Sequence, residues 1–300
     1  MKIGVIAEFN PFHNGHKYLL SKIKEKYPSS EIVIALSSDY VQRGEKAIVS
    51  YEERKEFALK YGATKVVPLD FFTSTQAAHV FAEGSIKILL KENIDVLCFG
   101  VSDTEDINKY ILAAKKIKQN INEYNSFLKK ELKQGKSFVA SAFSSLNNLM
   151  KEEEIPTDIL GFEYTKYIIF NNIPIQLDCF KRTIEHNSLF PNDEYASGSC
   201  IREMIKCGLD VSKYTPMKIN FNFPKIEDEY SKFQEIVRSS TAEELSQILL
   251  VSEGMENLFK KHIDLTSYNE FVDACTSRRY TASRIKRVIL YVLLGIQKTK

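Results

Sequence analysis

The sequence is short of paired cysteines, long apolar runs and an excess of either charge. Its five cysteines are odd in number and show no CxxC spacing, so neither a disulfide framework nor a zinc knuckle is expected. No apolar run approaches the ~18 residues of a membrane span, and no signal-peptide core follows Lys2. We therefore expect a cytoplasmic protein that has no membrane partner.

The formal net charge of +2 on 300 residues favours no class of partner, but the basic residues are unevenly distributed. Residues 271–300 contain seven Lys and Arg side chains against Asp273 alone, a net charge of +6. The rest of the chain is then net acidic, at about −4. This asymmetry predicts a basic surface near the C-terminus.

Five apolar segments of strand character alternate with helical segments along the first two thirds of the chain. The strands are expected over residues 2–7, 31–38, 64–70, 94–100 and 173–180. Helical spacing follows the first strand, Ser50 and Glu53 form a capping-box pattern, and residues 104–154 and 197–206 are also helical in character. This alternation predicts an α/β fold with a doubly wound, Rossmann-like parallel sheet.

A connector rich in Pro and Asn, residues 215–228, separates this region from an almost entirely helical remainder. We therefore predict two domains, residues 1–214 with the sheet and residues 215–300 with helices.

The segment EFNPFHNGH follows the first predicted strand. Ligands of doubly wound sheets bind beyond the carboxyl ends of the strands, and this loop enters a helix whose N–H groups favour phosphate. His13 and His16 can stabilise charge on a pentacoordinate phosphorus and a leaving pyrophosphate, and Gly15 lets phosphate approach the backbone. The ordinary alternative is two surface histidines. Because the chain has only five histidines, this H-x-G-H pattern directly after a strand favours nucleotidyl transfer.

A second candidate is SGSCIRE, at the start of the helix that follows the fifth strand. Ser197, Ser199 and the helix N–H groups, with Arg202 one turn later, can form a second anion site. Taken alone, a serine at this position usually serves only as a cap. No further His or Cys residues cluster at ligand spacing, so no protein metal site is predicted.

The third candidate is the basic segment SRRYTASRIKRVILYVLLGI, residues 277–296. An apolar stripe on its helix leaves Arg284, Arg287 and Tyr291 together on another face. A cationic face with an aromatic ring fits an RNA backbone and base stacking. A solvated basic face fits equally well.

In this order, the motifs resemble the bacterial tRNA(Met) cytidine acetate ligases of the H-x-G-H nucleotidyltransferase superfamily. EFNPFHNGHKYLL is similar to that family's opening signature, and VQRGEKAIV, FKRTI, SGSCIRE and RRYTASRIKR are similar to later blocks. Three departures are visible. Asp158 stands where the family has Asn, FGVSD replaces F-G-S-E around Ser102 and Asp103, and typical members continue further beyond the basic helix.

The resemblance implies a nucleotidyltransferase-type sheet domain with a helical C-terminal domain. It also implies an enzyme that forms acetyl-adenylate from ATP and acetate, with Mg²⁺ on the triphosphate, and acetylates N4 of the wobble cytidine in elongator tRNA(Met). The catalytic residues would be His13 and His16. The ATP-binding residues, including the two serines of the second anion site, would be Ala7, Glu8, Phe9, Asn10, Pro11, Phe12, His13, Asn14, Gly15, His16, Lys17, Tyr18, Leu19, Leu20, Gly100, Asp158, Arg182, Ser197 and Ser199. The tRNA-binding residues would be Arg278, Arg279, Arg284, Lys286 and Arg287.

Two alternatives remain open at the level of sequence. One is a small-molecule adenylyl- or cytidylyltransferase, which would not need a basic C-terminal segment. The other is a non-catalytic nucleotide- and RNA-binding protein, although the intact histidine pair favours an enzyme.

Overall fold

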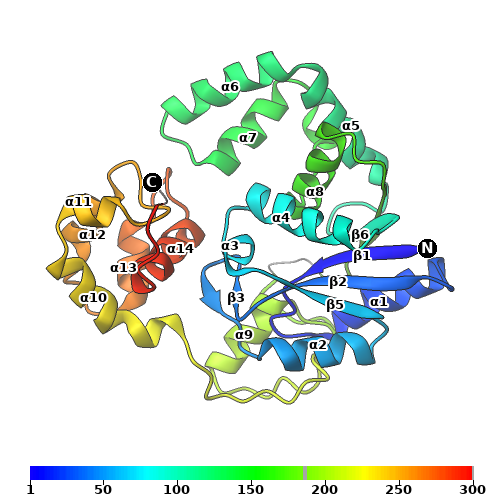
Figure 1. Cartoon of the computed structure of the whole chain (residues 1–300), viewed down its shortest axis with the longest axis horizontal. Helices are drawn as coiled ribbons and strands as arrows, with labels where there is room; N and C mark the ends of the chain where they lie inside the picture. Colours follow the sequence, from blue (N-terminus) through cyan, green and yellow to red (C-terminus); the bar gives the residue numbers. More distant parts are fainter. Residues whose placement is uncertain (185–187, 299–300) are drawn as a thin grey trace.

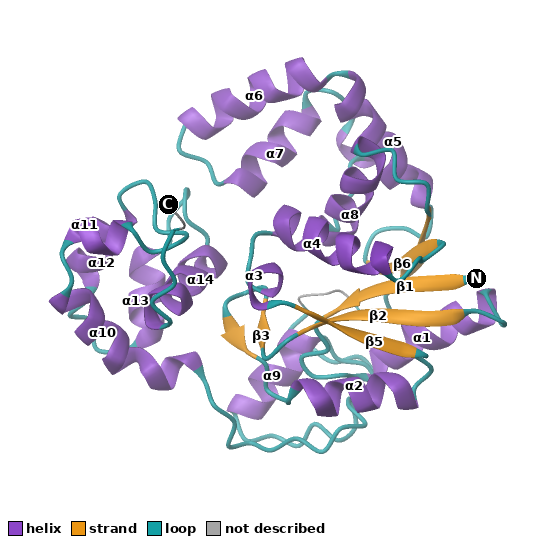
Figure 2. Cartoon of the chain, viewed as in Figure 1, coloured by secondary structure: helices purple, strands orange, loops and turns teal. Residues whose placement is uncertain are grey.

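A five-stranded parallel sheet forms the centre of the computed structural model, which describes residues 1–184 and 188–298 (Figures 1 and 2). Its strands are β1 (Lys2–Ala7), β2 (Glu31–Ser37), β5 (Lys65–Leu69), β6 (Val96–Val101) and β7 (Gln176–Lys181), in the spatial order β5-β2-β1-β6-β7. All neighbouring pairs are parallel, with Ile3 of β1 opposite both Ile32 and Val96. The predicted doubly wound α/β sheet is confirmed, and each predicted strand is present.

Helices cover both faces of the sheet, as Figure 1 shows. The first face is covered by α1 (Asn14–Lys26), α2 (Tyr51–Lys60) and α9 (Gly198–Lys206), which share one apolar cluster with the strands. The second face is covered by α4 (Ala78–Lys91), α5 (Ile107–Gln119) and α8 (Ile159–Phe170). Strands buried on both faces have continuous apolar runs, which is why the sequence indicated them so clearly.

Two further helices, α6 (Ile121–Lys133) and α7 (Phe138–Asn147), extend from α5 as an antiparallel hairpin (Figure 1). Ala113 and Ile117 of α5 pack there with Tyr124, Leu146 and Ile155 in a small cluster of their own. A short 3₁₀ helix, η1 (Glu152–Glu154), leads back towards α8.

The C-terminal helices form a separate core. They are η2 (Ile226–Glu229), α10 (Tyr230–Ser239), α11 (Ala242–Ser246), α12 (Met255–His262), α13 (Tyr268–Cys275) and α14 (Ala282–Leu293). Residues as far as Phe223 pack on the sheet core, and the helical core begins at Ile226. The helical character of this region is as expected, and the division at residues 214 and 215 stays a prediction.

The sequence did not predict the hairpin of β3 (Tyr40–Val41) and β4 (Glu45–Lys46), the short helix α3 (Phe71–Ser74) or α8. Tyr40 and Phe71 pack against the helical core, so the hairpin and α3 form the side of the sheet domain that contacts α14. Among the described residues, no helix is both long and apolar enough to cross a membrane.

Candidate functional site

The loop that follows β1 lies at the point where the chain order of the sheet reverses. β1 is flanked by β2 and by β6, and the helices that follow β1 and β6 cover opposite faces. The chain therefore diverges at the carboxyl ends of these two strands, which is where doubly wound sheets bind their ligands. Residues Glu8 to His13 occupy this position and lead directly into α1.

Two histidines cap the start of α1. The backbone N–H of Gly15 donates to His13 Nδ1 at 3.1 Å, and the backbone N–H of His13 donates to His16 Nδ1 at 3.1 Å. The imidazoles thus form a reciprocal capping box, and their rings stack with centroids 3.6 Å apart. Because each Nδ1 accepts a hydrogen bond, the neutral form of each ring has its proton on Nε2. Both histidines are therefore set up as Nε2–H donors at a helix N-terminus.

Gly15 and Gly198 both lie in close contact with side chains of this loop and of α9. A Cβ on Gly15 would lie 2.9 Å from His13 Cε1, so any larger residue would displace the capping ring. A Cβ on Gly198, the first residue of α9, would lie 3.1 Å from Arg202 Nη1 and 3.9 Å from His13 Cδ2. The starts of α1 and α9 are therefore adjacent, as the two anion-site motifs suggested.

Several contacts from distant segments hold the loop before α1 in place. Arg202 Nη1 donates to the carbonyl of Asn10 at 2.8 Å, and Asn10 Oδ1 accepts the backbone N–H of Ile48 at 2.8 Å. Thr215 Oγ1 donates to the carbonyl of Phe12 at 2.6 Å. Phe9 has a left-handed φ of 48°, which is unfavourable for a bulky residue. Its ring is buried against those of Phe12 and His16.

Arg54 is fully buried beside this loop, and the sequence motifs did not single it out. Its guanidinium donates to the carbonyls of Glu8 and Ser37 at the ends of β1 and β2, and also to those of Val49 and Ser38. Burial lowers the pKa of Arg54 to about 10. This arginine therefore neutralises carbonyl dipoles at the carboxyl edge of the sheet and fixes the direction in which the loop leaves β1.

The two serines of the second motif have different roles. Ser197 is buried, its hydroxyl donates to the carbonyl of Ser188 at 2.6 Å, and it accepts the N–H of Cys200 at 3.0 Å. It is therefore the cap of α9. Ser199 Oγ accepts from Arg202 Nη2 at 3.1 Å, which places Arg202 between α9 and the loop before α1.

Gly100, Asp158 and Arg182 come together at the carboxyl ends of β6 and β7. Asp158 Oδ1 accepts the N–H of Gly161 at 2.9 Å and caps α8, while Oδ2 pairs with Arg182 Nη1 at 2.7 Å. The Arg182 side chain lies over Gly100, where a Cβ would be 3.2 Å from its Nε. The carboxylate at position 158 therefore has both a capping and a charge-pairing function, which the sequence did not reveal.

Asp103 holds the loop that follows β6 against the segment that precedes Asp158. Tyr110 Oη donates to its Oδ1 at 2.5 Å and the N–H of Thr157 donates to its Oδ2 at 3.2 Å. Burial alone would raise the pKa of Asp103, but these hydrogen bonds and Lys109 lower it. The loop after β6 is thereby tied to the residue that precedes Asp158.

Two further polar groups lie at this edge. Thr183 Oγ1 is buried without a hydrogen-bond partner among the described residues, and it lies 3.9 Å from the position of a Cβ on Gly15. Glu8 Oε1 accepts the N–H of Gln42 at 2.7 Å, and desolvation raises the pKa of Glu8. The FKRTI and EFNPFHNGH motifs contain these residues, but only the folded chain shows their surroundings.

The five predicted tRNA-binding residues do not share one open face. Arg278 is exposed, Arg279 pairs with Glu253 at 2.6 Å, and Arg284 pairs with the same carboxylate at 3.2 Å. Lys286 instead pairs with Glu45 of the hairpin at 2.7 Å.

Arg287 and Tyr291 are buried. Arg287 donates to the carbonyl of Gln42, and the Tyr291 hydroxyl bonds to Thr75. The expectation that Arg284, Arg287 and Tyr291 form one solvated face is therefore wrong. The apolar stripe of α14 lies in the helical core, and the flank that carries Arg287 and Tyr291 docks on the sheet domain.

The comparisons with known proteins agree with this geometry. Residues 1–300 match the HIGH Nucleotidyl Transferase family. The tRNA(Met) cytidine acetate ligase of Mycoplasmopsis pulmonis is 53% identical, over 99% of this chain and 100% of that protein. The protein of that name from Mycoplasma mobile is 48% identical, over 99% and 100%. The chain belongs to the tRNA(Met) cytidine acetate ligase family.

Solved structures of related proteins have the same fold. Thermotoga maritima TmcAL in its apo form has a TM-score of 0.88 and 25% identity, over 99% of this chain and 76% of that one. The same protein bound to alpha-thio ATP has a TM-score of 0.85 and 26% identity, over 99% and 75%. The tRNA(Met) cytidine acetate ligase family includes longer members, since 79% of the Geobacillus protein of that name is covered at 30% identity.

Proposed function

We propose that this protein is an ATP-dependent ligase that forms acetyl-adenylate and transfers the acetyl group to N4 of the wobble cytidine of elongator tRNA(Met). The observation that carries the proposal is the pair of imidazoles that cap α1, next to the start of α9. It occurs in a chain 53% identical to a protein named for this reaction.

In the first step, a carboxylate oxygen of acetate attacks the α-phosphorus of ATP, and the bond to the β-phosphate oxygen breaks to release pyrophosphate. Negative charge grows on the phosphoryl oxygens and the leaving group. Imidazole N–H donors of His13 and His16, and the N–H groups at the starts of α1 and α9, are suited to stabilise this charge. Because the capping box fixes the rings before ATP arrives, their orientation costs little during the reaction.

The remaining predicted contacts assign parts of ATP to two sides of the sheet edge. We assign the triphosphate to the loop and first turns spanning Ala7 to Leu20, next to α9. We assign the ribose or base to the group formed by Gly100, Asp158 and Arg182, which lies beyond the neighbouring strands. Thr183 lies between the two groups and offers an unsatisfied hydroxyl.

Magnesium would accompany ATP rather than occupy a site made by the protein. The described residues contain no group of three His, Cys, Asp or Glu side chains able to hold a metal ion. Mg²⁺ commonly binds through substrate phosphates and water with one or two carboxylates. The ion would offset triphosphate charge, and the chain's own donors would orient the phosphates.

In the second step, the cytidine amine attacks the acetyl carbonyl carbon, AMP leaves, and the amine gives up one proton. The mixed anhydride would hydrolyse if water reached it, so a bound RNA loop must cover the site. Of the predicted tRNA-binding residues, Arg278 and Arg279 are exposed and Arg284 is partly exposed, so these three can still contact an RNA backbone.

The test is to incubate the protein with ATP, labelled acetate and elongator tRNA(Met) transcript, and then to analyse the nucleosides. We expect labelled N4-acetylcytidine, and none from a matched transcript with uridine at the wobble position. Acetate-dependent ATP–pyrophosphate exchange without tRNA isolates the first step. ATP binding without exchange and without N4-acetylcytidine would instead identify a non-catalytic nucleotide-binding protein.

A further inference from the structure

Helices α5 and α6 carry a second concentration of positive charge, separate from the C-terminal helices (Figure 1). Residues 107–136 contain eight lysines against two glutamates, a net charge of +6. Since residues 271–300 also carry +6 and the whole chain only +2, the rest of the protein is net acidic. Positive charge is therefore concentrated in two separate segments of the chain, and α6 of the α6–α7 hairpin lies in one of them.

Most of the lysines in this segment lack a partner that would neutralise them. Lys109 pairs with Asp103, Lys136 with Glu131, and Lys118 donates to Asn172 Oδ1 at 2.7 Å. The other five are exposed and make no ion pair with a described residue: Lys115, Lys116, Lys129, Lys130 and Lys133. Unpaired, exposed ammonium groups on these consecutive helices are available to a polyanion.

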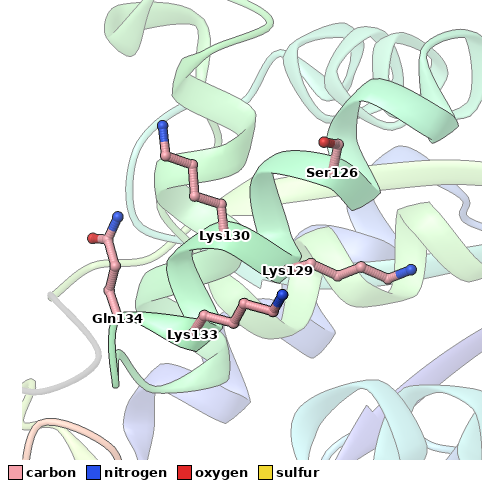
Figure 3. A pocket seen from close by; sticks show the side chains of 5 residues that line it. All are labelled: Ser126, Lys129, Lys130, Lys133 and Gln134. Atoms are coloured by element: carbon pink, nitrogen blue, oxygen red, sulfur yellow. The ribbon is translucent and has the colours of Figure 1, made fainter.

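Three of these lysines form a single stripe on α6. Lys129, Lys130 and Lys133 lie three, four and seven residues beyond Ser126, so they share one face of the helix. Together with Ser126 and Gln134 they line a surface hollow of about 480 Å³ (Figure 3). Tyr124, on the opposite face, packs into the core of the hairpin. The stripe is therefore a defined surface on a helix whose opposite face is packed.

Exposed aromatic rings on the partner helix are an independent observation. Phe138 and Phe143 of α7 are 43% and 41% exposed, and Val139 between them is 45% exposed. Phe138 contacts the ring of His79 at 5.4 Å, and His79 lies in the first turn of α4, at the carboxyl edge of the sheet. Neighbouring apolar side chains exposed in this way mark interaction sites. Exposed aromatic rings and lysines, here on the two helices of one hairpin, are the side chains that bind unpaired nucleotides by stacking and charge.

We propose that the α6–α7 hairpin is a second RNA-binding surface, on which Lys129, Lys130 and Lys133 contact backbone phosphates and Phe138 and Phe143 stack on unpaired bases. The inference rests on the proposed function. A wobble cytidine that enters the adenylation site belongs to a long RNA molecule, whose backbone must lie on other parts of the protein surface. RNA-binding proteins recognise such loops by stacking splayed bases on aromatic side chains. With the basic C-terminal helices, the hairpin would hold the RNA at two places.

The charge variant Lys129→Glu, Lys130→Glu, Lys133→Glu tests the phosphate contacts. Its control is Lys60→Glu, Lys91→Glu, which reverses two exposed lysines at the amino edge of the sheet that make no ion pair with a described residue. We expect the hairpin variant to bind tRNA at least roughly ten-fold more weakly than wild type. The salt slope, which is the slope of log affinity against log salt concentration, should fall in magnitude by about 2 to 3, or 0.7–0.9 per phosphate contact. The control variant should have the tRNA affinity and the salt slope of the wild type.

Phe138→Ala with Phe143→Ala tests the stacking. We expect a higher KM for tRNA with an unchanged salt slope, and recovery in the double Tyr variant, which keeps the rings. If the hairpin variants bind tRNA like the control, the proposal is wrong. A change in the oligomeric state of the alanine variant without a change in tRNA binding would also overturn it, since the rings would then bind a second copy of the chain.

Acetate-dependent ATP–pyrophosphate exchange separates this inference from the proposed function. The hairpin is not part of the predicted ATP site, so exchange should be equal in wild type and both hairpin variants. Absence of exchange in the wild type would contradict the proposed function, whereas the binding titration would still test the surface. If the wild type catalyses this exchange and the hairpin variants bind tRNA with unaltered affinity, only the proposed RNA-binding surface is contradicted.

Discussion

His16 accepts the backbone N–H of His13 through Nδ1, so its replacement removes a capping acceptor and an imidazole N–H donor together. We expect His16→Ala to lower acetate-dependent ATP–pyrophosphate exchange by roughly 10²–10³-fold, the effect of losing one preorganised donor. Loss of the cap should cost only about 1 kcal/mol of stability. His262→Ala, at the end of α12, is the control. Wild-type exchange in His16→Ala would remove this histidine from the mechanism.

Glu8 gives a pH-dependent prediction at the same scale. Burial raises its pKa above the ordinary value of 4.5, so the native state binds more protons than the unfolded state over the pH range between the two pKa values. The free energy of unfolding contributed by Glu8 therefore falls as pH rises through that range. We expect Glu8→Gln to be more stable relative to wild type at pH 8 than at pH 4.

Urea unfolding of both proteins at the two pH values measures this difference. Gln can still accept the N–H of Gln42, so the substitution removes the charge and keeps the contact. A stability difference that is the same at both pH values would show that desolvation of Glu8 does not matter. A stabilised but less active variant would indicate that the buried carboxylate is kept for function at a cost in stability.

At the scale of elements, the β3–β4 hairpin connects the site loop to α14. The N–H of Gln42 donates to Glu8, and its carbonyl accepts from Arg287 of α14. Glu45 of β4 pairs with Lys286, and this contact lowers the pKa of Glu45 although burial opposes it. A hairpin with two-residue strands has too little alternation to be recognised in the sequence, so this connection was not predicted.

Gly44, at the turn of this hairpin, is the most sensitive position of the contact. It has φ of +76°, and a Cβ there would lie 2.6 Å from the backbone nitrogen of Arg287. We expect Gly44→Ala to lower the free energy of unfolding by about 2–4 kcal/mol, from backbone strain and steric overlap together. Gly208→Ala is the matched control, with φ of +71° and nothing within 4 Å.

The control measures the backbone strain of an alanine at positive φ without steric overlap, which should lower the free energy of unfolding by about 1 kcal/mol. Urea denaturation of both variants measures the two losses. Equal losses at the two positions would mean that α14 can move away from the β3–β4 hairpin at little cost in free energy.

At the scale of the whole molecule, the sheet core and the core of the C-terminal helices are joined by buried groups rather than by the connector alone. The core of the C-terminal helices includes Tyr40 and Phe71 from the sheet domain at its margin. Tyr291 Oη lies 2.9 Å from Thr75 Oγ1, and Gln76 Nε2 donates to Tyr291 Oη at 3.2 Å. The helical domain is thus held beside the carboxyl edge of the sheet, where a macromolecular substrate can contact both.

This arrangement separates two arginines that look alike in the sequence. We expect Arg278→Ala to weaken tRNA binding and lower the salt slope by about 0.7–0.9, the value of one phosphate contact, with unchanged stability. Arg287→Ala should instead lower the free energy of unfolding by about 1–3 kcal/mol, because it leaves the carbonyl of Gln42 without its buried donor. The reverse pattern in binding and urea titrations would return Arg287 to the RNA-contact surface.

The five strands, the helix that follows H-x-G-H and the helical C-terminal region could be predicted, because each depends on neighbours within a few residues. Apolar runs mark strands buried on both faces, and caps such as Ser50 and Ser197 act three residues away. The surroundings of Glu8, Asp158 and Arg287 could not be predicted, because their partners come from other segments of the chain.

The sequence by itself therefore determined the order of elements, the paired histidines and their place after the first strand. Only the tertiary structure decided that α1 and α9 begin side by side, that Asp158 pairs with Arg182, and that Arg287 and Tyr291 are buried. Local periodicity and capping depend on near neighbours, whereas burial and charge pairing depend on which distant segments the packing of the sheet and helices brings together.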